Sequence, residues 1–229
     1  MSRLKTVSLP ELDRMHLIIK TKQEIRAHPA YTQIDSESNE CWYWNRVWCS
    51  EVALAEWLIH EFYPDKLLGK TVLELGCGTG LAGLVAAKLG GRTTFSDKIP
   101  MVLDTLQETC AINGIVEYQT LLLDWSRPGT LPERYHMVLG SEIFYDVCFL
   151  GDLHGLLKAA LADEGRGVFC DPNRLGFDVL EDWLSPQFQM HVEPRMVDWP
   201  QKCAGQGLRK RVFLYDVMKK YQEFSDRKA

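Results

Sequence analysis

The apolar positions of the chain change period repeatedly between residues 71 and 170. Short apolar runs of strand length alternate there with longer stretches in which apolar residues recur every three or four positions. The short runs predict strands over Thr71–Leu75, Thr93–Ser96, Tyr118–Leu123, Tyr135–Gly140 and Gly167–Cys170, and the stretches predict helices over Leu81–Leu89, Met101–Ile112 and Leu150–Leu161. This alternation is typical of a mainly parallel sheet with helices on both faces.

The C-terminal part of the chain adds two more strands to this pattern. Phe188–Val192 and Arg211–Met218 predict strands that pair antiparallel, after a short helix over Val179–Leu184. Seven strands in this order predict a Rossmann-like, doubly wound α/β fold whose mainly parallel sheet has its last strand antiparallel.

The first 70 residues show weaker patterns. They predict a strand over Met15–Lys20, a polar loop over Ile34–Glu40, and a helix that begins with Ser50 as N-cap and ends before Pro64. We expect residues 1–40 to be an N-terminal extension that packs on a single domain of residues 41–229.

Composition narrows the class of protein. The chain has 229 residues, of which 46% are hydrophobic and 25% charged, and a net charge of −5. General nucleic-acid binding needs clustered Lys and Arg, so the acidic balance argues against it. No apolar run approaches the roughly 20 residues of a membrane span, no secretory signal is visible, and the seven cysteines contain no Cys-x-x-Cys pair. We expect a monomeric protein of the cytoplasm or an organelle matrix that binds no membrane.

A glycine-rich turn follows the strand at Thr71–Leu75. Gly76, Gly78 and Gly80 give G-x-G-x-G directly after the strand, whereas the dinucleotide pattern G-x-G-x-x-G begins two residues later, at Gly78. In a dinucleotide site the first glycine follows the strand immediately. The turn is therefore predicted to hold S-adenosyl-L-methionine rather than a pyrophosphate.

Acidic residues stand at the ends of three predicted strands. Glu74 can bind an ammonium group or orient the turn, and Asp97 can accept hydrogen bonds from both hydroxyls of a ribose. Asp124 can accept from an adenine amino group while Trp125 covers the base, but the same pair also suits a turn former beside a core residue. Together these residues favour a methyl-donor site.

Three segments resemble the class I methyltransferases, and within them the non-histone protein-lysine methyltransferases. They are Val47-Trp48-Cys49-Ser50, the cofactor turn Glu74–Leu81, and the acidic-x-x-aromatic motif Glu142-Ile143-Phe144-Tyr145. The run Leu139–Asp146 and the motif Asp171-Pro172-Asn173-Arg174 are most similar to the electron-transfer-flavoprotein β-subunit branch. Many members have Asp where this chain has Glu142, so the carboxylate is displaced by one methylene.

The resemblance implies methyl transfer to a lysine amine of a protein substrate. Glu142 and Tyr145 are the predicted catalytic residues, with Phe144 and Trp44 as further aromatic walls that disfavour the charged amine. The predicted cofactor contacts are Trp48, Glu74, Gly76, Cys77, Gly78, Gly80, Asp97, Lys98, Asp124, Trp125 and Ser141. Core packing is the alternative for Trp48 and Tyr145, and Asp171-Pro172 either lines the same mouth or opens a turn.

Other functions remain as alternatives. Nucleic-acid or glutamine methylation calls for an Asn/Asp-Pro-Pro-Tyr/Phe turn, which residues 141–145 lack. Arginine methylation uses a pair of glutamates, and no second glutamate occurs in residues 143–163. A small-molecule amine methyltransferase is the main alternative. A non-catalytic cofactor-binding adaptor and a dehydrogenase are two further ones.

Overall fold

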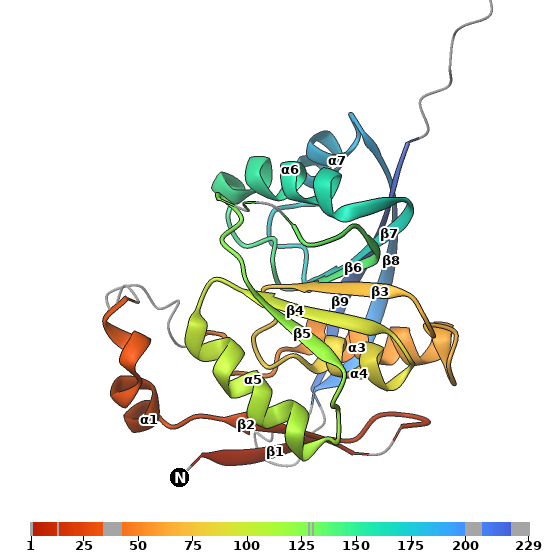
Figure 1. Ribbon diagram of the computed structural model, residues 1–229. Coiled ribbons are helices and arrows are strands. Elements are labelled where there is room, and N and C mark those ends of the chain that lie inside the picture. The colour runs from red at the N-terminus through yellow and green to blue at the C-terminus, as the bar shows by residue number, and fades with distance from the viewer. Residues whose placement is uncertain are drawn as a thin grey trace, which may run out of the picture.

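A seven-stranded sheet forms the centre of the molecule (Figure 1). The computed structural model describes residues 2–12, 14–33, 43–127, 129, 131–199 and 208–220. The sheet strands are β3 (Thr71–Leu75), β4 (Arg92–Asp97), β5 (Tyr118–Leu122), β6 (Tyr135–Ser141), β7 (Leu161–Asp171), β8 (Phe188–Trp199) and β9 (Leu208–Lys219). Their order is β5-β4-β3-β6-β7-β9-β8.

The strand directions confirm the predicted fold class. Strands β3, β4, β5, β6 and β7 run parallel to one another. The last strand, β9, runs antiparallel to both β7 and β8. The order reverses on either side of β3, which is a topological switch point, and ligands of open α/β sheets bind beyond the carboxyl ends of the strands at such points.

Helices cover both faces of this sheet, as Figure 1 shows. The helices are α1 (Lys22–Ala27), α3 (Cys49–Phe62), α4 (Leu81–Lys88), α5 (Pro100–Ile112), α6 (Leu150–Ala160) and α7 (Phe177–Leu184), with short 3₁₀ turns η1 (Pro29–Gln33) and η2 (Val147–Phe149). Helices α3, α4 and α5 share one hydrophobic core with one face of the sheet. Helices α6 and α7 share a second core with the other face. The central strands β3, β4 and β6 are therefore buried on both sides, which explains their apolar runs, whereas the edge strand β5 is largely exposed.

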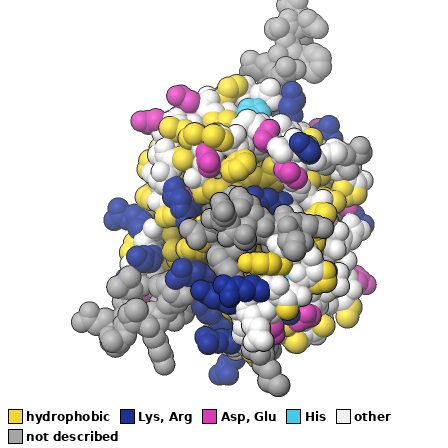
Figure 2. Space-filling view, turned by 90° about the vertical axis from the view of Figure 1, so that its left-hand side faces the viewer, with side chains coloured by type: hydrophobic (Ala, Val, Ile, Leu, Met, Phe, Trp, Pro, Cys, Tyr) yellow, Lys and Arg dark blue, Asp and Glu magenta, His cyan; other side chains and the backbone are white. Residues whose placement is uncertain are grey.

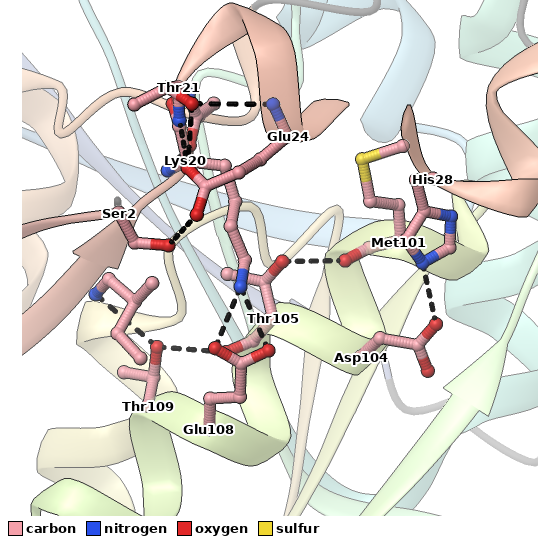
Figure 3. Close-up of polar contacts among 12 residues, drawn as sticks. Ser2, Lys20, Thr21, Glu24, His28, Met101, Asp104, Thr105, Glu108 and Thr109 are labelled. Carbon is pink, nitrogen blue, oxygen red and sulfur yellow. Dashed lines mark hydrogen bonds and ion pairs between the residues drawn. The ribbon is translucent and has the colours of Figure 1, made fainter. Parts of the chain in front are cut away.

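The N-terminal residues form a hairpin that lies along α5. Strands β1 (Arg3–Val7) and β2 (Met15–Ile19) pair antiparallel, and the strand predicted over Met15–Lys20 is confirmed. Asn113 at the end of α5 bonds both backbone groups of His16, at 2.9 and 2.6 Å. Figure 3 shows Lys20 and His28 reaching Glu108 and Asp104 on α5. The hairpin thus orients α5 from outside the sheet.

The helix α3 begins differently from the prediction. Its N-cap is Trp48, whose side chain makes no capping bond. Ser50, predicted as the N-cap, lies one residue inside the helix and is fully buried, which leaves its hydroxyl for a tertiary contact described below. The helix ends at Phe62, before Pro64 as predicted. The predicted loop over Ile34–Glu40 lies outside the described residues.

Within the described part of the chain, no helix has the length and apolar content needed to cross a membrane. The carboxyl ends of the parallel strands lie on the left-hand side of Figure 1. Figure 2 views the molecule from that side, where Lys and Arg side chains gather over the lower half and hydrophobic and acidic side chains over the upper half.

Candidate functional site

The glycine turn after β3 has a backbone that requires glycine. Gly76, Gly78 and Gly80 have φ of 58°, 50° and 79°, in the left-handed region. A Cβ on Gly78 would lie 3.2 Å from the carbonyl oxygen of Trp44, and one on Gly80 would collide with Leu106 on α5. The turn is therefore tightly enclosed, and it leads directly into the N-terminus of α4, whose N–H groups favour negatively charged partners.

Glu74 supports the turn from beneath. Its carboxylate accepts from the backbone N–H of Gly83, in the first turn of α4, at 3.1 Å. Burial raises the pKa of this side chain well above its usual value, and the charge of Glu51 raises it further. Of the two roles predicted for Glu74, orienting the turn matches this geometry.

Glu51 on α3 holds the same turn from the other side. Its carboxylate accepts from the hydroxyl of Thr79 at 2.6 Å and from the N–H of Leu81 at 2.9 Å. Burial raises its pKa to about 7. Sequence analysis treated Glu51 only as a first-turn acid of its helix, because nothing in a local pattern shows a contact 30 residues away. It is a positioning residue for the turn.

Asp97 ends β4 beside the turn. Its two oxygens accept from the N–H groups of Gly78, at 3.3 Å, and Ile99, at 3.0 Å. Burial raises its pKa to about 6. The adjacent amide of Cys77 donates to the carbonyl of Ser96 at 2.9 Å. Strand β4 and the glycine turn are thereby joined into one wall.

Asp124 and Trp125 follow β5, the edge strand next to β4. Asp124 is exposed, and it accepts from the N–H and hydroxyl of Ser126, which lower its pKa. A Cβ on Gly76 would lie 3.3 Å from the indole of Trp125, so the ring borders the glycine turn. Lys98 extends over the ring of Phe149 at 6.0 Å.

Two tryptophans, Trp44 and Trp48, lie just before α3 in the chain. The backbone of Trp44 packs against Gly78. Its side chain is 7% exposed, and Nε1 has no hydrogen-bond partner among the described residues. Trp48, the predicted cofactor contact, instead donates from Nε1 to the carbonyl of Tyr43 at 3.0 Å and stacks under Arg46.

Glu142 has an unusual backbone at the end of β6. Its φ is +57°, a conformation that costs a non-glycine residue roughly 1–2 kcal/mol. Its N–H donates to the carbonyl of Cys170 in β7 at 2.8 Å. This bond fixes the backbone that follows the end of β6. The side chain accepts from the hydroxyl of Ser50 at 2.6 Å and pairs with Arg174.

Arg174 joins this glutamate to a second carboxylate. Its Nη1 donates to Asp171 at 2.8 Å, and Nη2 donates to Glu142. Asp171 ends β7, is fully buried, and also accepts from the N–H of Arg174 at 2.9 Å. Burial raises the pKa of Asp171 to about 6. The predicted Asp171-Pro172 turn is present, but Ser50 and Arg174 were not predicted as site residues.

The two aromatic residues after Glu142 point in different directions. Phe144 is fully buried and packs on Phe169, Trp183 and Tyr215. Its prediction as a wall of the acceptor pocket is therefore wrong. Tyr145 is 43% exposed and meets Phe149 edge-on at 5.5 Å, at the same end of β6 as Glu142.

Comparison with known proteins agrees with this architecture. A family model described as lysine methyltransferase matches residues 32–176. Histone-arginine methyltransferase METTL23 of Rattus norvegicus is 36% identical over 106 residues, 44% of this chain and 46% of the relative. Protein N-lysine methyltransferase METTL21A of Danio rerio is 35% identical over 163 residues, 64% of this chain and 74% of the relative.

The fold is shared more widely. Magnesium protoporphyrin IX methyltransferase (ChlM) from Synechocystis PCC 6803, solved with bound SAH, superposes with a TM-score of 0.55 at 14% identity, over 72% of this chain and 80% of that one. The match to the METTL23 relatives spans only about half of their length. The family match, by contrast, covers more than half of this chain. The resemblance predicted from the sequence is thus confirmed, and the chain belongs to the lysine methyltransferase family.

Proposed function

We propose that this protein transfers a methyl group from S-adenosyl-L-methionine to a lysine amine of a protein substrate. The observation that carries the proposal is the glycine turn at Gly76–Gly80, which is enclosed on both sides and borders Ile143 just beyond the end of β6. Family membership supports the reaction, and relatives named as lysine methyltransferases support the substrate class.

The cofactor residues fit such a donor. The glycine turn is enclosed, and the buried indole N–H of Trp44 beside it is without a partner among the described residues. An N–H of this kind is costly unless a ligand acceptor meets it. In this proposal Asp97 accepts from the ribose hydroxyls, and Asp124 with Trp125 binds the base. The bound donor supplies an electrophilic methyl group on a sulfonium.

The acceptor side supplies orientation. Methyl transfer is an in-line displacement, so the protein mainly aligns the amine with the methyl group. Glu142 would hold the amine by a hydrogen bond, and Tyr145 would line its path. Because ammonium has no lone pair, the lysine must lose its proton, which the partly apolar surroundings favour.

Arginine methylation is a second candidate that one observation favours. That observation is the similarity to relatives named as histone-arginine methyltransferases. The acid pair formed by Glu142 and Asp171 is, however, already bound to Arg174 of the same chain, so lysine stays the first candidate. We keep the expectations that the protein is monomeric, binds no nucleic acid in general, and acts in the cytoplasm or an organelle matrix.

The experiment is labelling of a cell extract with isotopic donor and the purified protein, followed by amino-acid analysis of the labelled proteins. Methyl-lysine is the expected product. Label confined to small molecules would overturn the protein substrate, and methylarginine would establish the second candidate. Calorimetry that detects no S-adenosylhomocysteine binding would overturn the cofactor assignment.

A further inference from the structure

Arg174 occupies the space between the two carboxylates of the acceptor side. Its guanidinium contacts Glu142 through Nη2 and Asp171 through Nη1. The Arg174 side chain is 35% exposed, whereas the side chains of Glu142 and Asp171 are 9% and 0% exposed. The arginine therefore covers the two acids on their solvent side, and a cationic side chain approaching Glu142 from solvent meets it first.

This arrangement is the one that a substrate arginine would require. Guanidinium groups are recognised by two parallel N–H···O bonds to carboxylate oxygens. The internal arginine already makes two such bonds, one to each acid. An amine needs a single acceptor position, and each carboxylate oxygen can accept two hydrogen bonds. In the Glu142 carboxylate, Oε1 accepts from Ser50 and the Cys49 thiol, whereas Oε2 accepts from Arg174 and keeps a second acceptor position.

Local geometry makes Arg174 difficult to displace. It lies three residues after Asp171, and its own backbone N–H is bonded to the other oxygen of that carboxylate. The short tether gives the side chain a high effective concentration at the two acids. A separate guanidinium competes poorly against a tethered one of the same chemistry.

We propose that Arg174 is a specificity-determining residue, whose guanidinium fills the Glu142–Asp171 pair and thereby restricts the acceptor to an amine. With Arg174 in place the three side chains carry a net charge of −1, which suits one further cation. This inference rests on the proposed function for its consequence, but the occupancy of the acid pair can be tested without turnover.

The test is binding of methylguanidinium and methylammonium to the full-length protein loaded with S-adenosylhomocysteine, by calorimetry. Arg174→Ala should bind methylguanidinium at least about ten-fold more tightly than the wild type does, because two freed carboxylates form a bidentate site. Methylammonium affinity should change less than about three-fold. No gain for methylguanidinium, or an equal gain for both cations, would overturn the proposal.

Two further variants keep the result interpretable. Adding Glu142→Gln to Arg174→Ala should remove the gain, since one acid of the pair is lost. If Arg174→Ala does not fold, Arg174→Lys serves instead. A smaller gain in methylguanidinium affinity is expected, because a lysine ammonium lacks the planar fork that bonds both acids and so competes less well for them.

Turnover supplies an independent readout. In extract labelling, the wild type should yield methyl-lysine and Arg174→Ala should add methylarginine. Arg166→Ala is the matched control, because it removes a two-bond Arg–Asp pair, with Asp216, in the middle of β7. It should yield no methylarginine. A wild type that labels no protein overturns the proposed function, while the binding comparison still decides the role of Arg174.

Discussion

The cofactor side and the acceptor side of the sheet edge are held together in different ways. Around the glycine turn, buried carboxylates accept mainly from backbone N–H groups: Glu74 from Gly83, Glu51 from Leu81, and Asp97 from Gly78. Beyond β6, charged side chains bind one another, and Glu142, Arg174 and Asp171 form a chain of ion pairs. The first arrangement fixes a backbone shape, whereas the second fixes a charge pattern.

The difference suggests how such a protein changes its acceptor while keeping its donor. A backbone cradle depends on conformation and tolerates few substitutions. A side-chain network at a strand end changes with single substitutions and leaves the sheet unaltered. Each variant below changes one of these regions or its surroundings, and the measured property, cofactor affinity or stability, tells the regions apart.

The largest effect is expected for Gly80→Ala. Its left-handed φ of 79° disfavours a Cβ by roughly 1–2 kcal/mol, and the added carbon would collide with Leu106. Affinity for S-adenosylhomocysteine should fall by about 100-fold or more, measured by calorimetry. Gly114→Ala is the control, since that glycine has a similar φ of 65° and open space around it. Equal losses in both variants would contradict an enclosed turn.

A pH dependence should appear at Glu51. Its folded pKa of about 7 lies above the usual glutamate value of 4.5, so its contribution to stability is full below the unfolded pKa and is lost as pH rises through 7. Glu51→Gln removes this loss. Relative to wild type, the variant should gain up to about 3 kcal/mol of unfolding free energy between pH 5 and pH 8, measured by denaturant titration.

The control for this measurement is Glu24→Gln. Hydrogen bonds from Thr21 lower the pKa of Glu24 to about 2, so it stays largely ionised throughout this range in both states. Its difference from wild type should barely change between pH 5 and pH 8. A Glu51→Gln difference that also stays constant would show that this carboxyl does not titrate differently on folding.

A smaller effect is expected at Asp97, the proposed ribose contact. Asp97→Ala should weaken S-adenosylhomocysteine binding by about 30-fold, because a hydrogen bond to a charged group contributes roughly 1.5–3 kcal/mol. Asp124→Ala should weaken it by less than about five-fold, since Asp124 is exposed. Calorimetry on both variants decides the order. A larger loss at Asp124 would reverse the assigned importance of the two strand ends.

The smallest effect is expected where the N-terminal hairpin meets α5. The Lys20–Glu108 pair is half exposed on the α5 side (Figure 3), and exposed ion pairs contribute roughly 0–1 kcal/mol. Glu108→Ala should therefore cost less than about 1 kcal/mol in denaturant unfolding and leave cofactor affinity unchanged. A clear loss of cofactor affinity would mean that the contact between the hairpin and α5 affects cofactor binding.

The sequence predicted the two regions unequally. The glycine turn and the central strands follow from local period and from residues that stand next to one another, such as Glu74 and Gly76. The acceptor side depends on contacts between segments far apart in the chain: Ser50 lies 92 residues from Glu142. Neighbouring aromatics were also indistinguishable, because nothing local shows that Phe144 points into the core and Tyr145 outward. Strand β1 was missed because its residues are mostly exposed and polar, with only Val7 buried, whereas its partner β2 carries an apolar run.

The central claim is that donor binding and acceptor orientation are separate. The most direct test measures S-adenosylhomocysteine affinity and the rate of methyl transfer in the same preparation of Glu142→Gln, which keeps the shape of the side chain and removes its charge. We predict an affinity within about two-fold of wild type and a transfer rate lower by about 100-fold. Equal losses in affinity and in rate would contradict the separation, and an unchanged rate would remove Glu142 from the site.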